Sequence, residues 1–251
     1  MIEEDSNPAE KSGSFPLTRW TRVGRLRGDP ESIEGRRALE ELCSAYWYPL
    51  YVFARRKGHS QENAQDLAQG FFAKILRGDF LAGADQSQGR MRTYLLTAFT
   101  RFMADEWDKS QAGKRGGGVE ILSLDFEDGE RRFIEEPTST QDHASAYERD
   151  WALSIIELSG AQLERECSQT GKAALFAALS PLITGAGELT SYESLTQVTG
   201  MTVEAMRQTV RRLRLRFKEI LRQIIADTLE NPTEAQVDAE LRCLRSALAD
   251  Q

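Results

Sequence analysis

The chain has 251 residues, 32 basic and 39 acidic side chains, a formal net charge of −7 and 40% apolar residues. This length permits one or two domains, and no apolar run approaches the roughly 18 residues of a membrane-spanning helix, so we exclude an integral membrane protein. The acidic N-terminus argues against a signal peptide and export. Because the chain has two histidines and three widely spaced cysteines, we expect buried thiols in a reducing cytosol, no metal site and no cofactor.

Charge is unevenly distributed along the sequence. Residues 120–150 contain ten acidic and three basic side chains, a net −7, whereas residues 90–115 contain three acidic and six basic ones, a net +3. Residues 202–223 contain two acidic and seven basic side chains, a net +5. Since electrostatic binding depends on local patches rather than on the total charge, these two basic segments keep nucleic acid open as a ligand.

Apolar spacing predicts helices along nearly the whole chain. Apolar residues recur at three- and four-residue steps over residues 39–53, 64–76 and 94–107. Pro49 lies inside the first of these helices and is expected to bend or break it. Ser60 is placed to cap the second helix. Together the three helices can bury a shared core, which defines a first domain.

The acidic segment that follows is expected to be a flexible linker with little packed structure. It lacks sustained periodicity and contains Gly129 and Pro137. The expected fold class is therefore all-α, with two helical domains joined by this acidic linker. In order, the segments are an N-terminal extension (1–30), a first helical domain (31–118), the linker (119–145), a second helical domain (146–230) and a C-terminal helical extension (231–251). The last helix could pack on the second domain, bind a regulator or simply end the fold.

Residues 191–213 have the spacing of a helix-turn-helix motif. A short helix, a tight turn at Gly200 and a longer helix capped by Thr202 follow one another. The apolar contacts between the helices are expected from Leu195, Val198, Val203, Met206, Val210 and Leu213. The outward face would carry Glu204, Arg207, Gln208, Arg211 and Arg212. Arg and Gln suit guanine and adenine edges, and the later arginines suit phosphates. The alternative is a solvated basic helix in an ordinary bundle.

A second surface is predicted on the helix over residues 94–107. Cations interleaved with aromatic rings suit single-stranded nucleic acid, because phosphates need charge and unstacked bases need rings. Tyr94 and Trp107 also lie on the apolar stripe, so core packing is as reasonable for each as base stacking. This surface on its own does not decide the function.

The ordered set of these features resembles the extracytoplasmic-function sigma factors of bacterial RNA polymerase. Residues 63–72 are similar to the polymerase-binding helix of that family, residues 89–107 to its promoter-melting and minus-10 helix, and the helix-turn-helix to its minus-35 reader. Four more motifs resemble a subgroup with longer termini, such as that of Planctomycetes and Verrucomicrobia: LTRW at 17–20, YWYPL at 46–50, KRGGG at 114–118 and GKAALF at 171–176.

The resemblance implies a cytoplasmic, non-enzymatic protein that joins core RNA polymerase through its β and β′ subunits and initiates transcription at specific promoters. An anti-sigma factor or another regulator is an open further partner. Polymerase contacts would come from Asp66, Gln69, Phe71 and Phe72, with the two phenylalanines acting directly or by shaping the helix from beneath. Minus-10 contacts would come from Arg90, Arg92, Tyr94, Arg101, Trp107, Lys109, Lys114 and Arg115. Minus-35 contacts would come from Thr202, Glu204, Arg207, Gln208, Arg211 and Arg212.

Two departures from the family pattern bear on alternative functions. Gly70 stands where the family usually has Glu, which removes a charge and costs about 1 kcal/mol relative to Ala in a helix interior. Arg101 stands where many relatives have Asn, so their minus-10 preference does not transfer. Gly70 favours the alternative of a stand-alone helix-turn-helix regulator or an adaptor that does not bind polymerase. An enzyme is disfavoured because the carboxylates of residues 105–108 do not converge on a pocket.

Overall fold

The computed structural model describes residues 33–76, 90–111, 125–135, 142–184, 192–229 and 232–249. Over these ranges the chain forms helices and no strand, which confirms the all-α prediction. In chain order the helices are α2 (Ile33–Arg56), α3 (Gln61–Leu76), α4 (Met91–Gln111), α5 (Phe126–Glu135), α6 (His143–Gln169), α7 (Ala173–Thr184), α8 (Tyr192–Thr199), α9 (Val203–Ala226) and α10 (Glu234–Ala249). The predicted N-terminal extension, Lys114 and Arg115 lie outside the described residues.

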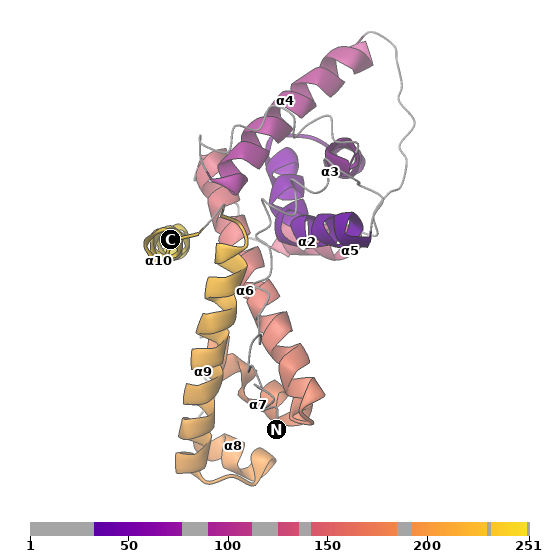
Figure 1. Cartoon of the computed structure of the whole chain (residues 1–251). Coiled ribbons are helices and arrows are strands. Elements are labelled where there is room, and N and C mark those ends of the chain that lie inside the picture. Colours follow the sequence, from indigo (N-terminus) through magenta and orange to yellow (C-terminus); the bar gives the residue numbers. More distant parts are fainter. Residues whose placement is uncertain are drawn as a thin grey trace, which may run out of the picture.

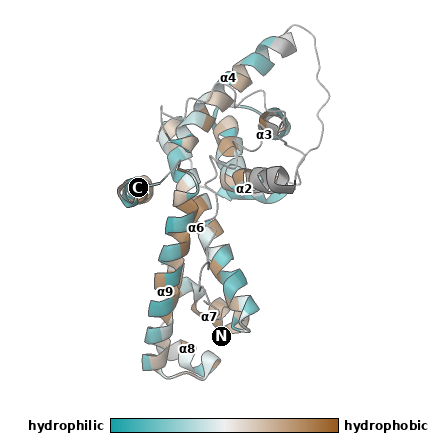
Figure 2. Cartoon of the chain, viewed as in Figure 1, coloured by the Kyte–Doolittle hydropathy of each residue, from teal (hydrophilic) through white to brown (hydrophobic). Residues whose placement is uncertain are grey.

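The helices form an elongated molecule in which α6 and α9 run lengthwise (Figure 1). Helices α2 to α5 gather at one end, and α7 and α8 lie at the other. Helix α10 packs against α6 and α9, which is one of the three roles considered for the C-terminal helix. Figure 2 shows hydrophilic residues along the outer side of α9 and apolar ones where α6 and α9 meet near the upper bundle.

The first core joins helices from both sides of the predicted linker. Helices α2, α3 and α4 contribute most of it, including the fully buried Tyr46, Phe71 and Phe99. Helix α6 adds Tyr147 and Trp151, and the end of α9 and helix α10 add further apolar side chains. The two segments that the sequence pattern assigned to separate domains therefore share one core in this structure.

Two smaller cores hold the opposite end together. The second core consists of Leu163, Cys167, Phe176, Ile183 and Ile220, from α6, α7 and α9. The third core consists of Leu179, Leu182, Leu195, Met206 and Val210, from α7, α8 and α9. As predicted, Cys43 and Cys167 are buried free thiols, whereas Cys243 is half-buried. The N-terminal half of α6 thus serves the first core and its C-terminal half serves the second.

Of the two effects predicted for Pro49, a bend or a break, the break is absent, because helix α2 continues through this residue. A proline in a helix interior costs about 3 kcal/mol because it removes a hydrogen bond and crowds the preceding turn. The residues around it are almost entirely inside the fold: Tyr48 is 2% exposed, and Leu50 and Tyr51 are 0% exposed. Because tertiary packing rather than local propensity supplies most helix stability, burial against α3 and α6 keeps α2 continuous.

The prediction of little packed structure over residues 119–145 is wrong for 126–135, which form α5. Phe126 packs edge-to-face on Trp47, with ring centroids 5.5 Å apart. A Cβ added to Gly129 would lie 2.8 Å from the same indole, a separation that real side chains do not show. Glycine therefore allows α5 to approach α2 closely. The composition suggested that Gly129 belongs to a flexible linker, whereas in the structure it allows α5 to dock on α2.

Charged groups complete the attachment of α5. Glu130 accepts hydrogen bonds from Arg55 at 3.0 Å (Nε) and 2.8 Å (Nη2), and from the hydroxyl of Tyr51. Burial opposes the charge of Glu130, but the hydrogen bonds from Arg55 and Tyr51 outweigh it and lower the pKa of this carboxyl. Arg132 pairs with Glu157 of α6 at 2.9 Å, so α5 is fastened to two helices.

We predict that Glu130→Gln loosens α5 at neutral pH and matters less in acid. The substitution keeps the shape of the side chain but makes its hydrogen bonds neutral, which should cost about 1 kcal/mol of unfolding free energy. Because the folded pKa of Glu130 is lowered, its ionised form stabilises the fold above the unfolded pKa of about 4.3. This contribution is lost as the pH falls through the folded pKa.

Urea unfolding of the wild type and the variant at about pH 7 and pH 3 measures this effect. Glu127→Gln, which neutralises an exposed carboxylate of the same helix, is the matched control. Equal losses in the two variants, or a gap between wild type and Glu130→Gln that does not narrow in acid, would contradict the assignment.

Candidate nucleic-acid interface

The predicted helix-turn-helix is present as α8 and α9. Gly200 lies between them at a φ of +66°, in the left-handed region that glycine adopts without a Cβ penalty. Its N–H donates to the carbonyl of Thr196 at 2.9 Å and closes α8. The hydroxyl of Thr202 accepts from the N–H of Ala205 at 3.3 Å, so Thr202 is the N-cap of α9 as predicted.

Helix α7 supports both helices of the motif through the third core. Of the apolar residues predicted to join α8 and α9, Leu195, Met206 and Val210 are buried and Val203 and Leu213 are half-buried. Val198 is 75% exposed, so its predicted role in the contact is wrong. Leu195, three residues earlier in α8, supplies the buried contact with α7 and α9 instead.

All five side chains predicted for the outward face of α9 are exposed, and we call this set the α9 face. It consists of Glu204, Arg207, Gln208, Arg211 and Arg212. The amide of Gln208 donates to Glu204 at 3.4 Å, and the guanidinium of Arg207 lies 5.6 Å from the ring centroid of Tyr192. These contacts are weak and solvent-exposed, so a ligand can replace them at little cost.

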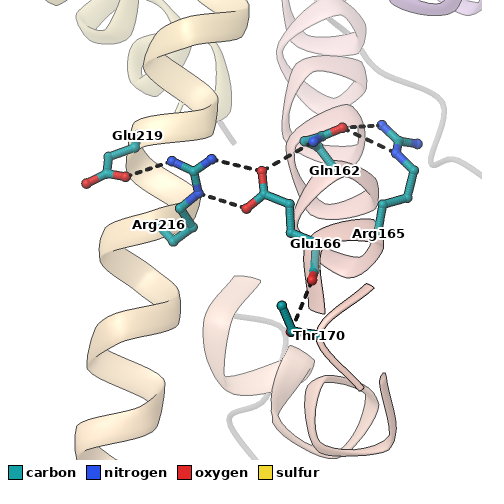
Figure 3. A network of polar contacts seen from close by, with 6 residues as sticks. All are labelled: Gln162, Arg165, Glu166, Thr170, Arg216 and Glu219. Atoms are coloured by element: carbon teal, nitrogen blue, oxygen red, sulfur yellow. Dashed lines mark hydrogen bonds and ion pairs between the residues drawn. The ribbon is translucent and has the colours of Figure 1, made fainter. Parts of the chain in front are cut away.

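The arginines farther along α9 are already occupied within the protein. Figure 3 shows Arg216 between Glu166 of α6, at 2.8 and 2.9 Å, and Glu219 of its own helix, at 2.9 Å. The hydrogen bond from Arg216 lowers the pKa of Glu166, and the hydrogen bonds to Glu166 and Glu219 raise the pKa of Arg216. Both groups therefore stay charged over the whole physiological range.

Arg214 and Arg222 are held in the same manner. Arg214 donates to the carbonyl of Leu182 near the end of α7 at 2.6 and 3.0 Å. Arg222 pairs with Asp238, at 2.5 Å, and with Glu234 of α10. The net charge of +5 over residues 202–223 therefore overestimates how many of these cations are available to a ligand. Three exposed arginines, Arg207, Arg211 and Arg212, lie in the N-terminal half of α9 on the α9 face, and Lys218 is a further exposed cation nearer its C-terminus.

The minus-10 residues predicted around α4 divide into buried and exposed groups. Arg92 is 2% exposed and pairs with Glu148 of α6 and Glu240 of α10, so in this structure it cannot reach DNA and that prediction is wrong. Its guanidinium lies over the ring of Trp151, 4.3 Å from the centroid. Arg90 is 43% exposed in its side chain and pairs with Glu240 at 2.6 Å.

The middle and distal parts of α4 retain the expected character. Arg101 is exposed, and Trp107 is 61% exposed, which favours the stacking interpretation for this indole over core packing. Tyr94 is half-buried and packs against the first core, so core packing describes it better. The side chain of Lys109 lies outside the described part of the chain.

A groove beside Arg101 adds residues that the sequence pattern did not single out. It has a volume of about 600 Å³. Its polar lining is Lys57 just after α2, Thr97, Thr100 and Arg101 from α4, and Asp142 and His143 at the start of α6, and its apolar lining is Phe53, Leu96 and Ala144. Cationic groups and hydroxyls of this kind bind phosphate and sugar oxygens. Lys57 and His143 belong to no motif, and only the packing of α2, α4 and α6 brings them together.

The four residues of α3 that were predicted to bind polymerase differ in how deeply they are buried. Asp66 is exposed and Gln69 is half-buried. Phe71 and Phe72 are 0% exposed, so the direct-contact interpretation is wrong and the supporting role from beneath is the one they can perform. A Cβ added to Gly70 would meet the ring of Phe102 at 3.2 Å, so glycine allows α3 and α4 to pack closely.

No family model matches this chain, and no curated protein or solved structure matches it either. None of the helices in the described ranges combines the length and the apolar composition needed to span a membrane. The described side chains also contain no cluster of three or more His, Cys, Asp or Glu residues suited to a metal ion. The features of this chain that bear on its function are therefore the exposed side chains of α3, α4 and α9.

We predict that Arg211→Gln weakens binding of duplex DNA, whereas Arg165→Gln does not. Both substitutions remove one exposed positive charge, but only Arg211 lies on the α9 face, and Arg165 of α6 bonds Gln162 instead. Loss of one phosphate contact should reduce the slope of log affinity against log salt by about 1. Fluorescence anisotropy across a salt series measures this slope, and equal changes in the two variants would contradict a defined DNA-binding face.

Proposed function

We propose that this chain is a sigma factor of bacterial RNA polymerase, a cytoplasmic protein without catalytic activity that directs the core enzyme to particular promoters. The observation that carries the proposal is the helix-turn-helix with its exposed α9 face. Acidic side chains pair with Arg216 and Arg222 farther along the same helix, whereas the three arginines of the α9 face stay exposed where a recognition helix needs them. Arg and Gln at its N-terminal end can donate to guanine and adenine edges in the major groove.

Helix α4 supports a second contact, with an opened strand of the promoter. The exposed indole of Trp107 offers a face on which an unstacked base can lie. Arg101 and Lys57, at the groove beside α4, supply charge for the phosphates of the same strand. Reading of duplex DNA by α9 and of single-stranded DNA by α4 are different chemistries, and a promoter-opening factor needs both.

The proposed polymerase contact lies on α3. Asp66 is exposed there, and Gln69 is half-buried next to it. Phe71 and Phe72 anchor this helix in the first core, which holds the exposed carboxylate on a rigid element. The proposed partners are the β and β′ subunits of core polymerase, promoter DNA and a regulator such as an anti-sigma factor.

A stand-alone DNA-binding regulator or an adaptor without polymerase contact is the second possibility. Gly70 favours it, because its close approach to Phe102 leaves α3 without the acidic side chain that the family has at this position. A stand-alone regulator binds duplex promoter DNA without polymerase, whereas a sigma factor acts on promoters as part of the holoenzyme. Binding measured with and without core polymerase separates the two.

We predict that the protein captures bacterial core RNA polymerase and that Asp66→Arg strongly weakens capture. Placing a cation where the partner meets an anion reverses the local Coulomb term and should lower retention by about tenfold or more. Glu164→Arg changes an exposed acidic residue of α6 by the same charge and should leave capture unchanged. Pull-down with purified core enzyme measures retention. No capture by a folded wild type, or equal losses in the two variants, would overturn the polymerase assignment.

We also predict that Gly70→Glu raises polymerase retention above that of Gly70→Ala. Both variants add a Cβ 3.2 Å from Phe102, so they share the same crowding, and only the glutamate adds charge. The gain in helix propensity of about 1 kcal/mol offsets this crowding, so we expect unfolding free energies within about 1 kcal/mol of wild type. Equal retention by the alanine and glutamate variants would show that the missing charge does not limit binding.

A further inference from the structure

The C-terminal helix α10 contacts the start of α4 through Glu240. Val237 and Leu244 are buried in the first core and anchor α10 beside α6 and α9. Glu240 lies one turn from each of them and is only 4% exposed. The α9 face is exposed and is not covered by α10. The helix therefore presents its buried carboxylate to α4 and not to the recognition helix.

Glu240 holds two arginines that the sequence pattern assigned to a DNA strand. One carboxylate oxygen pairs with Nε of Arg90 at 2.6 Å, and the other pairs with Nη1 of Arg92. Arg92 has a second carboxylate partner, Glu148, whereas Glu240 is the ion-pair partner recorded for Arg90 within the described residues. Arg90 is also the more exposed of the two, so it is the one that a new ligand can reach first.

A carboxylate and a phosphate use a guanidinium in the same way. Each offers two oxygens to the parallel N–H groups of an arginine, and both pairings are charge-assisted. The side chain of Arg90 is 43% exposed, so water partly screens its pair with Glu240 and the pair contributes little net free energy. Exchange of Glu240 for a phosphate at Arg90 is therefore close to balanced, and release of counterions from a nucleic acid favours the exchange.

The remaining polar attachment of α10 is solvent-exposed. Glu234 and Asp238 pair with Arg222 of α9, and their side chains are 89% and 50% exposed. Ion pairs of this kind contribute little and are screened by salt. The helix is thus held by its apolar face and by Glu240. A ligand that competes for Arg90 removes one of the two ion pairs of Glu240, and the more deeply buried pair with Arg92 remains to be broken if α10 leaves.

We propose that α10 is an autoinhibitory helix: Glu240 occupies Arg90 in the free chain, and a single-stranded nucleic acid must displace this carboxylate to use that arginine. The inference rests on the proposed role of α4 as a surface for an opened strand, but not on polymerase binding. It assigns to the C-terminal extension a competitive function at α4.

The test uses the full chain and a fluorescent single-stranded DNA oligonucleotide. Glu240→Gln keeps the shape of the side chain and removes its charge, so affinity should rise by about tenfold at low salt. Asp238→Asn removes one charge from the same helix without contacting α4 and is the matched control, with an expected change below about twofold. Adding Arg90→Gln to Glu240→Gln should abolish the gain. Equal gains in the two single variants, a gain that survives Arg90→Gln, or no binding by any variant would overturn the proposal.

A measurement on the wild type keeps the proposal testable if Glu240→Gln does not fold. Hydrogen exchange of the amides of α10 should accelerate when saturating single-stranded DNA is added, because the displaced helix loses its packing. Unchanged or slower exchange in α10 would overturn the proposal. Capture of core polymerase is measured separately. If the chain captures polymerase but fails these tests, the autoinhibitory role of α10 is rejected and the proposed sigma-factor function stands.

Discussion

The arrangement depends on α6, one continuous helix that serves two cores. Trp151, 1% exposed, stands in the first core together with residues of α2, α3 and α4. Farther along, Leu163 and Cys167 belong to the second core, which supports α9. Because a helix is stiff over this length, the position of the α9 face relative to α4 is set by packing on opposite ends of one element. Figure 1 shows this helix crossing from the upper bundle to the helix-turn-helix.

The acidic side chains decide which of the many arginines remain available. Glu166 and Asp238 occupy Arg216 and Arg222, and Glu240 occupies Arg90 and Arg92. An arginine held between carboxylates retains its charge but has few donors left for a ligand. The net charge of a segment therefore reflects how many cations it contains, whereas the positions of the carboxylates that pair with them decide which cations can bind a ligand. This explains how an acidic chain can present localised basic faces.

Local signals in the sequence predicted the parts of the fold that local interactions determine. The 3.6-residue stripes, the Thr202 cap and the Gly200 turn each depend on neighbours within one or two turns, and all are present. The misplaced residues depend on distant segments. Arg92 is buried because α6 and α10 supply carboxylates from 56 and 148 residues away, which no helical period encodes. The groove at Lys57 and His143 has the same origin.

Gly129 and Gly70 show why a prediction from composition fails where contacts between helices decide the structure. From backbone entropy alone, Gly129 indicates a linker and Gly70 indicates a flexible, destabilising position in a helix. In the structure each glycine faces an aromatic ring. A Cβ at Gly129 would clash with Trp47, and a Cβ at Gly70 would crowd Phe102. The entropy cost of glycine is the same in both readings. Its benefit, a closer approach of two helices, exists only once the partner helix is in place, so a sequence pattern registers the cost alone.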